Sequence, residues 1–317
     1  MAGSRRKTLS QKKKLYLILT VVFLVVCLLI EGLGRIPWIP FNGWSDVYSF
    51  FGMGMETVVP EGELQVHFID VGNADCILVR QEAFNMMIDA GERSSASDVL
   101  DYLNRQHIEK LDLVIATHPD ADHIGGMSDV INAVEVGRFV MAYMPEGAEP
   151  TSAIYANMLE ALDKHNIEVV EANPGDVYEV GTARLQILAP LKESDDTNAM
   201  SIVTRLVFGD RAFLFTGDAD EQVERLIMTK GYQVKADVLK VGHHGSNTSS
   251  SRAFLDAVSP SYAVITCGEN NRYGHPHQQT LKQLIERGVP YIRSDISGDI
   301  VFYTDGTELT VKKELGD

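Results

Sequence analysis

The chain has 317 residues, of which 45% are hydrophobic and 23% charged, as in an ordinary globular protein. This composition excludes collagen-like, disulfide-stapled and wholly disordered chains, and the length allows one large domain or two of roughly 150 residues. The formal net charge of −16 leaves no overall basic surface for holding polyanions by counterion release. Cys27, Cys76 and Cys267 lie in apolar runs, which predicts buried free thiols rather than disulfides or thiolate metal sites.

Residues 1–14 form a basic tail that is followed by an apolar run. Six of the first 30 residues are basic and none is acidic. The run from Leu15 to Ile30 has one clearly polar side chain and lacks the polar face of a core helix. Its sixteen residues would span about 24 Å as a helix, and Gly32 to Trp38 would extend it toward a hydrocarbon core of about 30 Å. Residues 15–34 are therefore predicted to be a transmembrane signal anchor.

A cleaved signal peptide is the alternative interpretation of this segment. The flank after Ile30 lacks a cleavage site of the Ala-x-Ala kind, which favours an uncleaved anchor. The Lys and Arg residues before the run then predict a single-pass protein of the cell membrane, with its N-terminus in the cytoplasm and the rest of the chain outside. If the anchor is cleaved, the rest of the chain would be secreted. Residues 35–62, rich in Gly, Pro and aromatic side chains, predict an interfacial stalk.

From residue 63 to 317, short β-rich runs alternate with helical patterns, and no repeat or Pro-rich linker divides them. One α/β domain is therefore predicted, and its many strands favour two packed sheets with helices outside. The predicted strands are 64–70, 76–80, 85–89, 112–117, 137–142, 167–171, 183–189, 200–208, 211–216, 236–241, 261–266, 289–293 and 299–304. The predicted helices are 96–107, 124–134, 152–165, 219–230, 251–258 and 277–287.

The densest group of metal-ligand residues follows the predicted strand 112–117. It reads Thr117-His118-Pro119-Asp120-Ala121-Asp122-His123, with Gly125 and Gly126 just after it. Sites in α/β folds lie at the carboxyl ends of strands. Alternate side chains would point the same way in an extended loop, and the glycines would let backbone segments approach closely. A solvated turn with a helix cap is the structural alternative.

Three further loops after predicted strands carry residues of the same kinds. Asp218 follows an apolar strand, where a plain helix cap is the alternative. His243 and His244 stand between glycines at another strand end, and His275 and His277 lie in a turn before a helix. Six of the nine histidines of the chain fall in the ligand-rich loops, and this concentration predicts a metal site.

In their order along the chain, these motifs resemble the metallo-β-lactamase superfamily and, within it, the extracellular nuclease-like domain of ComEC-type competence proteins. The resemblance rests on HFIDVGNAD at 67–75, HPDADHIGG at 118–126, TGD at 216–218, VGHHGS at 241–246 and YGHP at 273–276. It implies a four-layer αββα sandwich, here preceded by the N-terminal transmembrane helix, with a two-metal site at one edge of the paired sheets.

The resemblance also implies the metal ligands. It assigns His118 and Asp120 to one metal, Asp122 and His123 to the other, and Asp218 to a bridging position between them. His244 is expected to complete the second metal, with His243 as the alternative. Asp70 would support the ligand loop from behind.

This chain departs from the commoner family pattern at two positions. Asp120 replaces a histidine, and the usual third histidine of the first metal is replaced near Asn198, which is expected to support the site. In the ComEC-like subgroup these departures accompany phosphodiester rather than lactam hydrolysis. The resulting oxygen-rich ligand set suits two divalent ions, Mn²⁺ or Zn²⁺.

The predicted catalytic set is Asp122, Asp218 and His275. Two metals would supply an activated hydroxide and stabilise the charge that develops on phosphate oxygens. His275 is expected to contact the phosphate or to protonate the leaving group, with a plain turn residue as the alternative. Ser246, Asn247 and Tyr273 complete the predicted substrate-binding set.

The sequence thus predicts a membrane-anchored, extracytoplasmic, metal-dependent hydrolase of phosphodiesters, with DNA, including single-stranded DNA, as the first candidate substrate. One alternative is a phosphodiesterase of small nucleotides or of cell-wall polymers, resembling a phosphorylcholine esterase, which would suit the acidic body. Another is a non-catalytic accessory module of a DNA-uptake machinery. GxSxG, GxxxxGK[ST] and GxGxxG signatures are absent, which removes the common lipase, P-loop and dinucleotide-binding classes.

Overall fold

The computed structural model describes residues 59–144 and 149–315, together with Thr20, Val22, Phe23, Val25–Cys27 and Leu29. The chain divides into two units, Met1–Glu56 and Thr57–Asp317. The few described residues of the first unit are helical, while the rest of the predicted anchor, the basic tail and most of the predicted stalk lie outside the described residues. Within the part that is described, no helix has the length and apolar character needed to cross a membrane.

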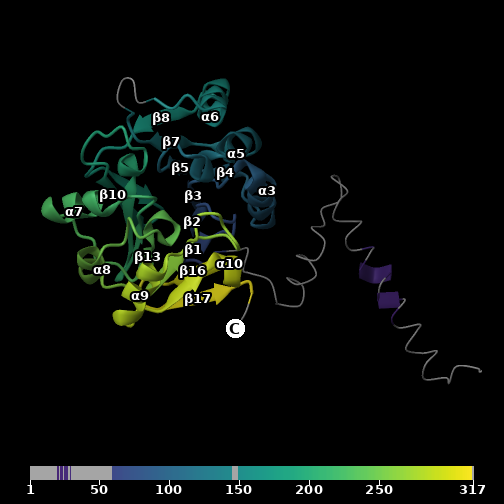
Figure 1. The fold of residues 1–317 in the computed structure, drawn as a ribbon. Coiled ribbons are helices and arrows are strands. Elements are labelled where there is room, and N and C mark those ends of the chain that lie inside the picture. The colour runs from purple at the N-terminus through teal and green to yellow at the C-terminus, as the bar shows by residue number, and fades with distance from the viewer. Residues whose placement is uncertain are drawn as a thin grey trace, which may run out of the picture. The chain divides into compact units, whose positions relative to one another are not determined.

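Two large sheets form the body of the second unit (Figure 1). The first contains, in spatial order, β17 (Leu309–Lys313), β16 (Ile300–Thr304), β1 (Leu64–Phe68), β2 (Ile77–Gln81), β3 (Phe84–Ile88), β5 (Leu113–Ala116), β7 (Arg138–Met141) and β8 (Glu168–Glu171). Its strands pair antiparallel from β17 to β3 and parallel from β3 to β8. The C-terminal strands β16 and β17 therefore return to the sheet that the chain starts with β1.

The second sheet repeats this arrangement. It contains, in spatial order, β15 (Tyr291–Arg293), β14 (Tyr262–Ile265), β13 (Val238–Lys240), β12 (Arg211–Phe215), β11 (Val203–Phe208), β10 (Ala183–Ala189) and β9 (Val177–Val180). Pairing is antiparallel from β9 to β12 and parallel from β12 to β15. A small separate ladder joins β4 (Lys110–Leu111) to β6 (Glu135–Val136).

Helices cover the outer face of each sheet (Figure 1). The first sheet carries α3 (Ala96–Arg105), α5 (Met127–Ala133) and α6 (Ala153–Lys164), and the second carries α7 (Glu221–Thr229), α8 (Arg252–Val258) and α9 (Gln278–Glu286). The short elements are α4 (Ala121–Ile124), α10 (Ser294–Ser297), η1 (Arg93–Ser95), η2 (Asn198–Met200) and η3 (Gly242–Gly245).

Three apolar layers hold these parts together. Phe68, Phe213 and Phe302 pack against one another between the two sheets, with ring centroids 6.1–6.2 Å apart where Phe302 meets the other two. The other two layers lie between each sheet and its helices. Each fully buried side chain of this size stabilises the fold by about 1.5–3 kcal/mol. Helix, sheet, sheet and helix thus form four layers, which confirms the predicted αββα sandwich.

Most predicted elements are confirmed within a few residues, and β10 matches its predicted range at both ends. The strands β4, β6, β9 and β17 were not predicted, and the first two have only two residues each. β9 and β17 are short, partly exposed strands at sheet edges, so each offers few apolar residues as a signal. Cys76 and Cys267 are buried free thiols, as predicted, and Cys27 is free and half-buried.

The predicted helix 124–134 is instead two helices, α4 and α5, separated by Gly125 and Gly126. A Cβ atom on Gly125 would lie 2.3 Å from the Ala121 carbonyl oxygen, and one on Gly126 would lie 2.4 Å from the Ala90 carbonyl oxygen. Both distances are too short for any side chain. The expectation that these glycines permit close backbone approach is therefore confirmed.

Candidate metal centre

Four loops that follow strands of the two sheets meet at one edge of the sandwich. The loop after β5 carries residues 117–126 from the first sheet. The loops after β12, β13 and β14 carry Asp218, the His243–His244 pair and His275 from the second sheet. Because β12, β13 and β14 are parallel neighbours, their carboxyl ends lie together at this edge. Each sheet therefore supplies one half of the site.

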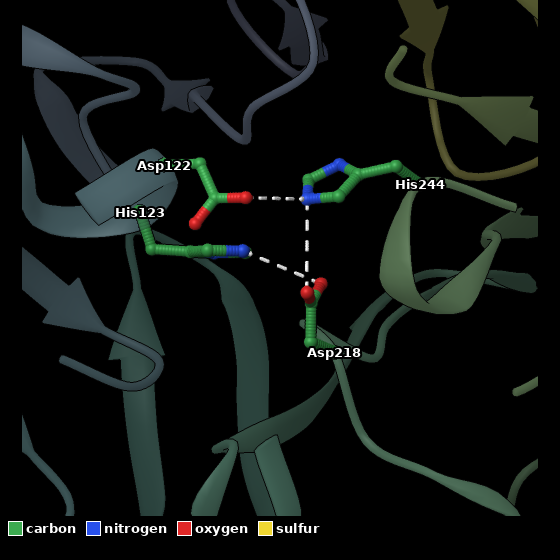
Figure 2. A group of neighbouring side chains, drawn as sticks. All are labelled: Asp122, His123, Asp218 and His244. Atoms are coloured by element: carbon green, nitrogen blue, oxygen red, sulfur yellow. Dashed lines mark ion pairs between the residues drawn. The ribbon is translucent and has the colours of Figure 1, made fainter. Parts of the chain in front are cut away.

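Four ligand-type side chains converge between these loops. Ligand atoms of Asp122, His123, Asp218 and His244 all lie within 4.8 Å of one another, and Figure 2 shows the side chains pointing toward a common centre. Asp218 Oδ1 is 3.3 Å from His123 Nε2, and Asp218 Oδ2 is 3.7 Å from His244 Nε2. His244 Nε2 is 3.4 Å from Asp122 Oδ2. We call these four residues the ligand cluster.

His118 and Asp120, the pair expected at the other metal, lie beside the ligand cluster. The His118 ring lies 4.0 Å from the His123 ring between centroids, and its Nε2 is 3.9 Å from Asp120 Oδ2. The Asp120 side chain remains 41% exposed and is hydrogen-bonded to Thr197. Asp120 is therefore more open than the ligand cluster, whereas the His118 side chain is fully buried.

Hydrogen bonds behind His123 and His118 set which ring nitrogen faces the site. His123 Nδ1 donates to Asp89 Oδ2 at 2.7 Å. The Thr117 hydroxyl donates to the same oxygen at 2.6 Å, so it can accept a hydrogen bond from His118 Nδ1, 3.1 Å away. Each ring thus directs its Nε2 toward the site, and this is the atom through which the deprotonated ring would bind a metal.

His244 follows the same rule, since its Nδ1 donates to the Thr266 carbonyl oxygen at 2.9 Å. Buried polar atoms normally have hydrogen-bond partners. Four buried atoms here have none, namely His118 Nε2, His123 Nε2, Asp218 Oδ1 and His244 Nε2. Imidazole nitrogens and carboxylate oxygens that converge without protein partners fit divalent metal ions.

A buried ion pair lies behind the ligands and joins the two sheets. Lys240, at the end of β13, and Asp75, in the loop after β1, are 0% and 1% exposed. Lys240 Nζ is 2.6 Å from Asp75 Oδ2, while Asp75 Oδ1 accepts a 2.5 Å hydrogen bond from the Thr266 hydroxyl. The other contacts of Asp75 reach the ligands, because its backbone N–H donates to the Asp122 carbonyl and its Oδ1 lies 3.5 Å from His244 Nδ1.

The charges of the site are mutually dependent. Burial disfavours the charge on Asp218, but His244 and His123 outweigh burial and hold the pKa of this carboxyl well below its ordinary value. Burial alone would lower the pKa of His123, whereas the carboxylates of Asp218 and Asp89 raise it well above the ordinary value. Burial and the neighbouring His123 lower the pKa of His118 to about 3. His118 is therefore neutral at pH 7, as a ligand must be.

The backbone of η3 separates the two adjacent histidines. His243 and His244 both have left-handed conformations, with φ of 50° and 52°, a strain of about 1–3 kcal/mol at each non-glycine residue. His244 is buried in the ligand cluster. His243 lies on its outer side, with Nε2 3.5 Å from Asp218 Oδ2 and Nδ1 3.3 Å from the Thr248 hydroxyl. The geometry thus favours His244 as the ligand, with His243 as its outer neighbour.

Asp70 makes no hydrogen bond to the ligand loop in the described part of the chain, so its expected role behind that loop stays a prediction. The Asp70 carboxylate accepts a hydrogen bond from the Gly72 N–H in its own turn, and the Asp70 N–H donates to Asp299. Asp75 and Asp89 make the contacts behind the ligands instead. Both residues could have been found from the sequence. Asp75 lies in the same sequence motif as Asp70, and Asp89 follows a buried strand, as Asp218 does.

Asn198 begins η2, in the loop that contacts His118 and Asp120. Its Oδ1 is buried without a hydrogen-bond partner, and its neighbour Thr197 bonds to Asp120. From the same loop, the Ser201 hydroxyl lies 3.4 Å from His118 Nδ1 and accepts a hydrogen bond from the Asp218 N–H at 3.2 Å. This loop therefore supports both halves of the site, and Ser201 was not predicted.

The residues expected to bind substrate differ in how exposed their side chains are and in whether they already have hydrogen-bond partners. The buried Ser246 hydroxyl accepts a hydrogen bond from the Thr248 hydroxyl, so it already has a role within its loop. Asn247 is exposed, and its N–H donates to His277 Nδ1 at 3.0 Å. His275 is buried, with its ring 5.5 Å from that of His243, and burial lowers its pKa to about 4. The Tyr273 ring is half exposed.

Comparison with known proteins agrees with this fold. A family model described as "Metallo-beta-lactamase superfamily" matches residues 69–269. "ComE operon protein 3" of Bacillus subtilis is 31% identical over 263 residues, which are 76% of this chain and 33% of that protein. "Competence protein ComA" of Neisseria gonorrhoeae is 32% identical over 291 residues, which are 90% of this chain and 38% of that protein. The chain thus spans about a third of the length of these curated relatives.

Among solved structures, the metallo-beta-lactamase fold protein YhfI of Bacillus subtilis is similar to this chain, with a TM-score of 0.52 and 13% identity. The match covers 76% of this chain and 99% of that one. At this identity the likeness concerns the fold.

Proposed function

The chain belongs to the metallo-beta-lactamase superfamily of metal-dependent hydrolases, and from this premise we propose that it is a phosphodiesterase whose substrate is DNA. The observation that carries the proposal is the convergence of unpartnered ligand atoms in the ligand cluster and at His118. One curated relative is named a competence protein, which supports a nucleic acid as the substrate.

Two divalent metal ions fit the residues that are present. His118, Asp120 and Asp218 would hold one ion, and Asp122, His123, Asp218 and His244 would hold the other. The mixture of carboxylates and imidazoles suits Mn²⁺, and Zn²⁺ is the alternative. When bound, such a pair supplies a nucleophile from water and neutralises negative charge on a phosphoryl group.

The protein residues have their own tasks in this reaction. Asp122, with its side chain 25% exposed at the mouth of the ligand cluster, and the buried Asp218 place negative charge where a phosphodiester must bind. An anionic substrate is repelled until divalent charge compensates these carboxylates, so the metal-free protein is inert. His275, neutral at pH 7, can donate a hydrogen bond to a phosphate oxygen or to the leaving oxygen.

The decisive experiment uses the purified full-length chain with Mn²⁺, Zn²⁺ or chelator. The substrates are single-stranded DNA, double-stranded DNA, a chromogenic phosphodiester and a wall polymer that carries phosphorylcholine. Cleavage of DNA should need metal, disappear in Asp122→Ala and persist in Asp101→Ala, an exposed aspartate on α3. Metal binding without cleavage of any phosphodiester would refute the proposal. Cleavage of the wall polymer alone would favour the cell-wall alternative.

We also propose that residues 15–34 anchor the protein in the cell membrane, with the catalytic domain outside and in reach of a DNA-uptake machinery. The support is the basic tail followed by the apolar run. Protease added to intact cells should then remove the domain, while the chain stays in the membrane fraction. A domain that is degraded only after lysis would refute this orientation.

A further inference from the structure

Flat side chains form a stack that leads from the ligand cluster to the protein surface. The rings of His244 and His275 lie 6.3 Å apart between centroids and at 28° to each other. The rings of His275 and Tyr273 follow at 5.5 Å and 20°. The Arg272 guanidinium lies 4.8 Å from the Tyr273 ring centroid. The stack thus begins at a ligand of the proposed metal site and ends on an exposed aromatic and a cation.

The loop that carries the outer half of the stack is held in place by one side chain. Asn271 Nδ2 donates to the carbonyl oxygens of Gly268 and His275, at 2.9 and 2.6 Å. Asn271 Oδ1 accepts a hydrogen bond from the His275 N–H at 2.9 Å. The Tyr273 ring is therefore presented on a preorganised loop, which lowers the entropy lost when something binds to it.

Packing of the fold does not account for Tyr273. Its side chain is 50% exposed and belongs to none of the three apolar layers of the described domain. The His275 ring contacts the Tyr273 ring, and the Arg272 guanidinium lies over it and donates to its hydroxyl at 2.6 Å, while half of the Tyr273 surface stays open to solvent. Arg272 and Tyr273 thus form the exposed flat end of the stack. A large aromatic surface beside the ligand cluster is suited to contact with a ligand.

Arg272 indicates which ligand suits this surface. Its guanidinium is exposed and is held on Tyr273, to whose hydroxyl it donates at 2.6 Å, so a cation stands at the outer end of the stack that starts from an acidic metal site. A guanidinium stacks on planar rings and hydrogen-bonds phosphate oxygens. It would repel the quaternary ammonium of a phosphorylcholine group, although aromatic rings alone would attract one.

We propose that Arg272 and Tyr273 form a stacking subsite for an unpaired nucleobase next to the scissile phosphate, which makes single-stranded nucleic acid the substrate class of this site. The inference rests on the proposed phosphodiesterase function. A base within a duplex is already stacked on its neighbours and cannot offer its face to Tyr273. A base in a single strand can do so, and stacking on an aromatic side chain tolerates any base sequence.

The test compares Tyr273→Leu with Tyr273→Phe in the full-length, metal-loaded chain. Removal of the aromatic face should raise KM for single-stranded DNA about tenfold, because the base then loses its stacking partner. Tyr273→Phe keeps the ring and should keep KM within about twofold of the wild type. The ratio of kcat/KM for single-stranded DNA to kcat/KM for a small chromogenic phosphodiester, which reaches the metal site without a flanking base, should therefore fall in Tyr273→Leu and stay close to the wild-type ratio in Tyr273→Phe.

Equal losses on the oligonucleotide and the small substrate, or no loss on either, would overturn the subsite while leaving the phosphodiesterase intact. Absence of cleavage by the wild type would overturn the proposed function itself. Binding of a fluorescent single-stranded oligonucleotide, measured by anisotropy, gives a readout that needs no turnover. There a weaker Kd in Tyr273→Leu alone supports the subsite, and equal Kd values in all three proteins refute it.

Discussion

The inner and outer parts of the metal centre are built differently. In the inner part, Asp75, Asp89 and Lys240 are fully or almost fully buried, and their charged groups have partners at 2.5–2.8 Å. In the outer part, the side chains of Asp120 and Asp122 are 41% and 25% exposed, and no described basic side chain pairs with them as closely. The inner part therefore determines the geometry of the ligands, while the outer part stays available for metal and substrate.

The two parts should respond differently to substitution. An unpaired charge in the inner part cannot be solvated, so a substitution that creates one lowers the stability of the fold and the affinity for metal. A missing carboxylate in the outer part is replaced by water, so its substitution lowers the rate of the reaction and leaves the stability of the fold nearly unchanged. Stability and activity, measured on the same variants, separate the two.

Lys240→Met should have the largest effect on stability. It leaves the buried Asp75 carboxylate without its cation, which costs about 3–5 kcal/mol of unfolding free energy. Urea unfolding measures this loss, and Lys282→Met, at an exposed ion pair on α9, is the matched control with no measurable change. The double variant Lys240→Met/Asp75→Asn should recover much of the loss. A single variant as stable as the wild type would show that the inner pair does not hold the sheets together.

Asp122→Ala should lower activity strongly and leave stability nearly unchanged, which is the opposite of the result expected for Lys240→Met. Loss of a ligand at the mouth should lower kcat/KM about 100-fold or more, equivalent to about 2.7 kcal/mol of transition-state stabilisation. The midpoint of urea unfolding should stay close to that of the wild type, since this side chain is partly exposed. A large fall in stability would contradict the distinction between the two parts.

Asp89→Asn should give an intermediate effect. The carboxylate accepts hydrogen bonds from His123 Nδ1 and from the Thr117 hydroxyl, and so orients a metal ligand. Loss of such a partner typically weakens metal binding 10–100-fold. Titration of the metal-free chain with Mn²⁺ or Zn²⁺ measures the change. Unaltered metal affinity would show that the backbone, rather than Asp89, orients His123.

The smallest expected effect concerns pH and a buried carboxyl on α7. Burial raises the pKa of Glu224 to about 7 from an ordinary value of 4.5, although the N–H groups of Ser250 and Ser251 donate to it. Between these values the folded chain binds more protons than the unfolded chain, so stability falls as pH rises from about 4.5 to 7. Glu224→Gln should flatten this fall. If the wild type and Glu224→Gln had identical pH profiles of unfolding free energy in urea, the raised pKa assigned to Glu224 would be contradicted.

Local patterns were enough to predict much of this molecule. Alternating and continuous apolar runs marked the strands around the site, because burial of one or both faces of a strand leaves a short-range signature. Ligand-type residues directly after those strands marked the loops that meet at the site. The edge strands β9 and β17 escaped prediction, because each is short and contributes only a few half-buried apolar residues.

The sequence by itself determined the kind of fold and the residues from which a metal site can form, since both depend on residue type and short spacing. Only the tertiary structure decided which acidic residues support the ligands, and that Lys240 joins Asp75 across the two sheets. The same is true of the stack that ends at Tyr273. Thr266 and Asp75 are 191 residues apart in the chain yet share a 2.5 Å hydrogen bond. Such partners are chosen by the packing of one sheet on the other, which no local pattern records.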